Sequence, residues 1–248
     1  MSTHLLPRWI GLDLRRIAHN GRFAAFSLIL PALFFVIFGI RDDLKTYHYP
    51  GGNATAYVMV SMAAYASAMA STSAAAQISA ERWQGWVRQL RALPPSLHSY
   101  VVVRVAVAAV QAAISEIPVF ALGALLGAQM NTAGWILCPI VCWLGSMMFA
   151  AFGVVIGFTM RSQNAMQIVG PGLTLLAALG GLFVPINSGP LQIVSAVSPL
   201  YGVGFLARQP IVQSTAVAGA VVNITVWLIA AVLASGWAVS RLVGRTVR

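Results

Sequence analysis

Residues 135–160 read WILCPIVCWLGSMMFAAFGVVIGFTM, a run of 26 residues without a charged side chain. A helix of this length is long enough to cross the hydrocarbon core of a membrane. Five further apolar runs occupy residues 23–40, 57–78, 99–126, 166–184 and 216–239. None of the runs shows the period-two alternation typical of a lipid-facing strand. The sequence therefore predicts an all-α integral membrane protein with six transmembrane helices.

The composition supports this prediction and excludes other classes of protein. The chain has 248 residues, of which 59% are hydrophobic and only 8% are charged. An ordinary soluble domain is about one-quarter charged, so a water-soluble globular protein is excluded. Intrinsic disorder is excluded on the same ground. The two cysteines are too few to build a disulfide scaffold for a chain of this length.

The distribution of basic residues predicts the orientation. Eleven arginines outside the apolar runs fall on one side of the membrane: Arg8, Arg15, Arg16, Arg22, Arg82, Arg88, Arg91, Arg161, Arg241, Arg245 and Arg248. The opposite side holds Arg41, Lys45 and Arg208, and Arg104 lies just inside the third run, from where we expect it to reach the interface. By the positive-inside rule both termini of this multi-pass protein are cytoplasmic, and the first run is a retained span of the cell membrane. The net charge of +10 then reflects topology, and no nucleic acid partner is expected.

Residues 5–20 predict an amphipathic helix that contacts lipid at the cytoplasmic interface. Apolar side chains recur there at helical spacing, and Trp9, Arg15 and Arg16 are of the types that settle at headgroup depth. The alternative is a short solvated tail with chance periodicity, and we favour the interfacial helix.

Residues 79–95 predict a short cytoplasmic helix that ends at two prolines, Pro94 and Pro95. One face of this helix would carry Trp83, Trp86, Val87 and Leu90, with the charges on the remaining faces. The alternative is a basic loop that only fixes topology. Because two tryptophans are unnecessary for topology, we favour a docking helix.

Two further segments predict how the spans pack. Residues 185–210 are apolar but broken by prolines and glycines, which predicts a re-entrant external hairpin of two short helices, near 190–196 and 199–207, covered by protein. Residues 57–78 carry small side chains at four-residue spacing, so this helix belongs inside the bundle. The ladders are Ala63, Ser67, Ser71, Ala75 and Ala64, Ala68, Thr72, Ala76.

Catalytic chemistry is not evident in the sequence. The single lysine, Lys45, follows Leu44 and is not part of the Gly-Lys-Ser/Thr sequence that a P-loop requires, so the chain is not expected to hydrolyse ATP. No histidine lies in a span, and Cys138 and Cys142 are interpreted as small buried hydrophobes, so no metal, cofactor or catalytic residue is predicted.

The third run contains two polar residues, Gln111 and Glu116, and Glu116 lies near its middle. A charge at that depth costs roughly 2.5–3.5 kcal/mol on insertion scales, so the carboxyl must face protein or water. It is either a structural hydrogen-bonding group or part of a polar transport path, and the sequence leaves both open.

This order of features resembles the permease of a type-2 ABC exporter, the family that includes daunorubicin-resistance-type drug exporters and polysaccharide and lipid exporters. Residues 81–95 are similar to the family's Glu-Arg-x-x-Gly stretch leading to Leu-Arg-x-x-Pro. A second similarity covers Gly180, Gly181, Phe183, Pro185, Pro199, Leu200 and Tyr201.

The resemblance implies one transmembrane domain over residues 1–248 that works with a second permease copy or homologue. It implies two ATPase subunits that bind ATP and Mg²⁺, and export of an amphipathic, drug-like or lipid-like substrate. The implied coupling residues are Glu81, Arg82, Trp83, Gly85, Trp86, Arg88 and Arg91. Arg88 and Arg91 stand where the family pattern usually has an acidic residue, which suggests an acidic surface on the ATPase.

Two other classes compete with this interpretation. An ATP-independent secondary transporter or channel predicts more intramembrane charges and an internal repeat, and neither is found between residues 23–126 and 135–239. A membrane-embedded lipid enzyme predicts a cluster of catalytic His, Asp or Glu residues, which the sequence does not supply.

Overall fold

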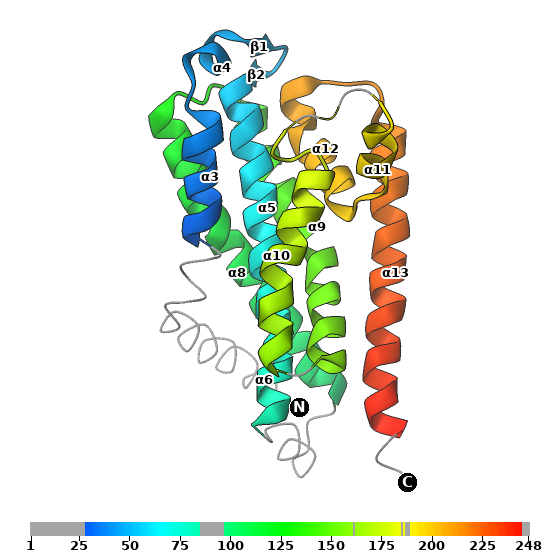
Figure 1. Ribbon diagram of the computed structural model, residues 1–248. Helices are drawn as coiled ribbons and strands as arrows, with labels where there is room; N and C mark the ends of the chain where they lie inside the picture. Colours follow the sequence, from blue (N-terminus) through cyan, green and yellow to red (C-terminus); the bar gives the residue numbers. More distant parts are fainter. Residues whose placement is uncertain (1–27, 85–96, 161, 185, 187–188, 245–248) are drawn as a thin grey trace.

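The computed structural model describes residues 28–84, 97–160, 162–184, 186 and 189–244 as a helical bundle with one small two-stranded sheet. In chain order the elements are α3 (Leu30–Gly39), α4 (Asp42–Thr46), β1 (His48–Tyr49), β2 (Gly52–Asn53), α5 (Ala54–Ala76), α6 (Ile78–Trp83), α8 (Leu97–Leu126), α9 (Thr132–Thr159), α10 (Ser162–Leu179), α11 (Leu191–Val197), α12 (Pro199–Val212) and α13 (Val217–Gly244). Figure 1 shows α4, β1 and β2 at one end of the bundle, called here the hairpin end, and α6 at the opposite end, called the α6 end.

Three of the described helices are long and apolar enough to cross a membrane: Tyr100–Leu126, Thr132–Thr159 and Val217–Arg241. A fourth candidate is the bent pair α11 and α12, while α3 and residues 167–179 are apolar but shorter. The prediction of an integral membrane helical protein is thus supported, and the count of six spans stays a prediction. The predicted interfacial helix over residues 5–20 lies outside the described residues.

Helix α5 lies at the centre of the bundle and contacts α3, α8, α9, α10 and α12. It is less apolar than α8, α9 and α13, yet nearly all its residues are buried. The Ser67 and Ser71 hydroxyls donate to the backbone carbonyl oxygens of Cys142 and Ser146 on α9, at 3.3 and 2.9 Å. The prediction that the small-residue helix lies inside the bundle is confirmed.

Close approach of α5 and α9 depends on a glycine at the crossing. A Cβ atom at Gly153 on α9 would lie 2.4 Å from the backbone oxygen of Thr72 on α5. The Thr72 hydroxyl also donates to the carbonyl oxygen of Phe149 at 3.2 Å. Small residues allow the backbones to approach, and the hydroxyls then bond across the gap.

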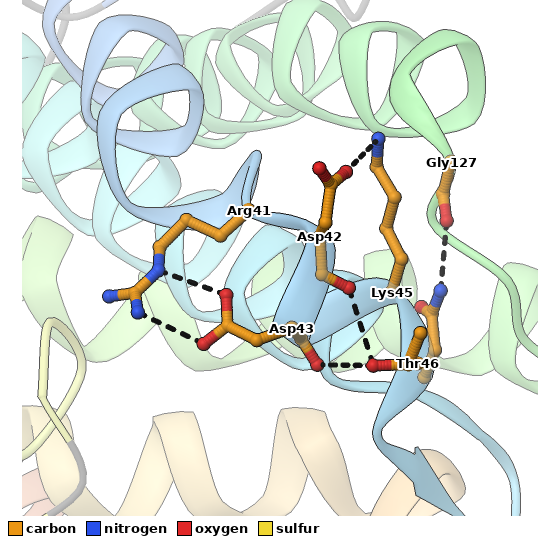
Figure 2. Close-up of polar contacts among 7 residues, drawn as sticks. Arg41, Asp42, Asp43, Lys45, Thr46 and Gly127 are labelled. Atoms are coloured by element: carbon orange, nitrogen blue, oxygen red, sulfur yellow. Dashed lines mark hydrogen bonds and ion pairs between the residues drawn. The ribbon is translucent and has the colours of Figure 1, made fainter.

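The hairpin end is held together by Asn53, which caps α5. Its side-chain oxygen accepts from the backbone N–H groups of Ala56 and Gln129, both at 3.0 Å, and its amide donates to the Gly127 oxygen at 2.8 Å. The start of α5 is therefore tied to the turn between α8 and α9. Above it, α4 carries two exposed ion pairs, Arg41 with Asp43 at 3.0 Å and Lys45 with Asp42 at 3.5 Å (Figure 2).

The two short helices predicted near 190–196 and 199–207 are found as α11 and α12, bent by 86° at Ser198. Side chains of α13 satisfy the carbonyl groups at this bend. Asn223 donates to the oxygens of Ala196 and Ser198, at 2.7 and 3.2 Å, and the Trp227 indole donates to the Val197 oxygen at 2.8 Å. The backbone carbonyl groups of residues 196–198 therefore have hydrogen-bond donors where the helix is interrupted.

Candidate functional site

At the α6 end, Glu81 points into the bundle and joins α6 to α8. Its carboxylate accepts hydrogen bonds from the Tyr100 hydroxyl and from the Arg104 guanidinium, with which it also forms an ion pair. All three side chains are buried. Because each of these buried charges would be costly without its partner, the ion pair holds α6 against the start of α8.

The prediction that Arg104 reaches the interface is wrong. Only 3% of the residue is exposed, and its guanidinium lies 5.5 Å from the Tyr100 ring centroid. Position along the span suggested a side chain free to extend toward water. In the structure the Arg104 guanidinium instead pairs with the Glu81 carboxylate on α6, so its charge is compensated within the protein.

The neighbouring residue, Arg82, joins α6 to α9. Its Nη1 atom donates to the carbonyl oxygen of Gly157 at 3.0 Å and to that of Phe158, and its guanidinium carbon lies 5.8 Å from the Phe158 ring centroid. These carbonyls belong to the last turn of α9, where a cation is favoured by the helix dipole. Partial burial lowers the pKa of the Arg82 guanidinium from its ordinary value.

Trp83 completes α6 and faces outward, with 77% of the residue exposed. Three consecutive side chains therefore have different environments: Glu81 bonds to α8, Arg82 bonds to α9, and Trp83 is on the surface. A force applied at Trp83 would be transmitted to α8 through the Glu81 ion pair and to α9 through the Arg82 hydrogen bonds. The remaining predicted coupling residues, Gly85, Trp86, Arg88 and Arg91, lie outside the described residues, as do Trp9, Arg15 and Arg16.

The two polar residues predicted within the third run are buried on α8. The Oε1 atoms of Gln111 and Glu116 have no hydrogen-bond partner among the described residues. Five positions along a helix correspond to a rotation of about 140°, so the two side chains leave α8 in different directions. They do not form one polar cluster.

An apolar groove of about 660 Å³ is lined mainly by residues of α9, α10, α11 and α13. Its walls include Phe149, Phe152, Leu173, Val197 and Trp227. Carbon atoms form nearly all of its surface, so it suits hydrocarbon rather than a hydrated ion. The sequence analysis did not predict this groove, because its residues come from six separate helices.

Metal ligands are not gathered anywhere in the described ranges, where no group of three or more His, Cys, Asp or Glu residues could hold a metal ion. Cys138 and Cys142 are buried free thiols, and the Cys142 Sγ atom lies 3.8 Å from the carbonyl oxygen of Val60. Their burial on one face of α9 agrees with their interpretation as small hydrophobes.

Comparisons with known proteins place these features in a family. The model of a family described as "ABC-2 type transporter" matches residues 13–208. A protein of Bacillus subtilis (strain 168) named "Putative transport permease YvfS" is 26% identical over 198 residues, which cover 77% of this chain and 79% of that relative.

Proposed function

Because the chain belongs to the ABC-2 type transporter family, we propose that it is the membrane-spanning permease subunit of an ATP-driven exporter. In this proposal α3, α5, α8, α9, α10 and α13 are six spans, and both termini and the α6 end face the cytoplasm. The bent pair of α11 and α12 lies at the outer side of the cell membrane. Helix α5 spans without high hydropathy because its neighbours shield it from lipid.

The observation that carries the proposal is the construction of α6. Its exposed Trp83 follows two side chains that bond directly to the ends of α8 and α9. A partner that binds this tryptophan would move both helices together, which is what coupling of ATP hydrolysis to a membrane bundle requires. Two ATPase subunits, which bind ATP and Mg²⁺, would dock here and at the predicted basic residues Arg88 and Arg91.

The substrate class follows from the apolar groove. A lipid-like or drug-like molecule with a large hydrocarbon part matches walls built from aromatic and aliphatic side chains. A second permease copy or a homologue would complete the transport path, and efflux of such molecules would give resistance to apolar drugs.

The coupling proposal is tested in vesicles that contain the chain and its ATPase partner. We expect Trp83→Ala, and separately Trp86→Ala with Arg88→Glu, to abolish stimulated ATP hydrolysis while expression and melting temperature are unchanged. Trp237→Ala on α13 is the matched control, because it removes another exposed tryptophan far along the chain from α6. Unchanged hydrolysis in both coupling variants would contradict the assignment. Full transport by the chain alone, without an ATPase, would favour a secondary transporter or channel.

A further inference from the structure

Arg208 is a buried cation at the hairpin end of the bundle. It belongs to α12, and only 5% of the residue is exposed. Its Nη1 atom donates to the Ser61 hydroxyl at 3.1 Å and to the Gly181 carbonyl oxygen at 3.3 Å. Both acceptors are neutral, and within the described ranges no acidic side chain forms an ion pair with it. A buried charge without a counter-charge is costly, so this position calls for an explanation.

A row of tyrosines orients the guanidinium. Its central carbon lies 4.5 Å from the Tyr57 ring centroid. Tyr57 stacks on Tyr49 with the centroids 5.4 Å apart, and Tyr49 meets Tyr47 edge to face at 5.1 Å. Burial and the neighbouring tyrosines raise the pKa of Tyr49. The ring faces attract the cation and fix its plane, but they supply no negative charge.

The guanidinium borders a pocket of about 500 Å³ between the tyrosine row and α11. Gln192, Ser195 and Gln209 add polar groups to the wall, while Phe205 and Val212 make part of it apolar. Among the residues that the structure describes, no acidic residue lines this pocket. Nη1 donates both hydrogen bonds that Arg208 forms with described residues. The N–H groups of Nε and Nη2, which lie on one edge of the guanidinium, therefore remain available to a ligand.

We propose that this pocket binds the phosphate or carboxylate group of an anionic amphiphile. The planar guanidinium can donate two parallel hydrogen bonds to two oxygens of such a group. The bound anion then supplies the negative charge that the described side chains around Arg208 do not provide. The apolar part of the wall accepts the carbon chain next to the anionic group. This site differs from the coupling site at the α6 end, and it does not depend on an ATPase.

The binding test uses the full chain in phosphatidylcholine nanodiscs and dodecyl phosphate as the probe, with neutral dodecyl maltoside as the comparison. Arg208→Gln removes the cation. Gln192→Glu keeps the arginine but places a carboxylate in the same pocket, and it stays informative if the first variant does not fold. Arg41→Gln and Gln129→Glu make the same charge changes on exposed residues outside the pocket.

We expect saturable binding of dodecyl phosphate that either pocket variant weakens at least about tenfold, or about 1.4 kcal/mol, and either control by less than about twofold. Equal binding by the wild type and Gln192→Glu would overturn the proposal. If inorganic phosphate competes as strongly as dodecyl phosphate, the carbon chain does not contribute to binding, and the proposal that the ligand is an amphiphile is overturned.

Native mass spectrometry of the purified chain distinguishes the two sources of the anion. Phosphatidylglycerol that copurifies with the wild type and is lost in Gln192→Glu identifies a membrane lipid as the ligand. Variant-sensitive binding of dodecyl phosphate without a copurified lipid identifies an amphiphile that arrives separately. Because none of these measurements involves ATP hydrolysis, their failure is distinguishable from failure of the proposed coupling.

Discussion

Arg104 on α8 forms a buried ion pair with Glu81 on α6, across 23 positions of the sequence. This contact joins the surface tryptophan of α6 to a long helix of the bundle. The attraction between the two groups also offsets the free-energy cost of burying their charges. In the proposed mechanism, stability and coupling therefore depend on the same pair of side chains.

Removal of one partner of this pair should be strongly destabilising. Glu81→Ala removes the carboxylate that pairs with the buried Arg104 guanidinium, and we expect a loss of about 3 kcal/mol in stability. The measurement is thermal unfolding of the detergent-solubilised chain. The double variant Glu81→Gln with Arg104→Gln should recover part of the loss, because both charges of the buried pair are removed together.

Arg41→Gln is the control for this prediction. It breaks the exposed ion pair with Asp43, which should contribute less than about 1 kcal/mol. If Glu81→Ala melts at the same temperature as Arg41→Gln, the buried pair does not stabilise the α6 end.

The crossing of α5 and α9 is sensitive to one methyl group. Gly153→Ala places a Cβ atom against the Thr72 backbone oxygen, so the helices must separate, and we expect a loss of about 1–3 kcal/mol. Gly236→Ala on α13 is the matched control. A Cβ atom there meets nothing within 4 Å, so the better helix propensity of alanine should stabilise by about 0.5–1 kcal/mol. Equal melting temperatures for the two variants would show that the crossing is not tight.

Glu116→Gln separates the two interpretations of this carboxyl group. The amide has nearly the same shape and carries no charge to be desolvated. We therefore expect the melting temperature to be unchanged or higher. If Glu116 belongs to the transport path, substrate efflux falls in the same variant. A lower melting temperature would instead assign the carboxyl a structural role.

Orientation can be tested with single cysteines, because Cys138 and Cys142 are fully buried and should not react. His48 at the hairpin end and Gln84 at the α6 end are exposed. We expect His48→Cys to react with a membrane-impermeant maleimide in intact cells, and Gln84→Cys to react only after permeabilisation. The opposite pattern would reverse the proposed topology.

The sequence was a good guide to the elements and a poor guide to their polar contacts. Small residues at four-residue spacing correctly placed α5 inside the bundle, since that spacing forms one face of a helix. Prolines and glycines correctly located the bend between α11 and α12. The interfacial helix and most of the coupling helix stay predictions, because they lie outside the described residues.

Arg104 and Arg208 show what periodicity could not reveal. Arg104 was assigned from its distance to the end of an apolar run and Arg208 from its position between two runs, and neither position carries information about the neighbouring helix. One signal was available for Arg104: Glu81 has the opposite charge and lies at the matching end of the preceding span. No comparable signal predicted that Arg208 would be buried beside Tyr57.

By itself, the sequence determined that this chain is a helical membrane protein, because the length and apolar character of a segment decide whether it can leave water. It also determined that the chain lacks a P-loop sequence, since that motif is local. Only the tertiary structure decided which buried charges are paired, where the groove and the pocket lie, and which side chains bond α6 to the bundle. These features bring together residues from separate helices, and the distances between helices are set by packing rather than by position along the chain.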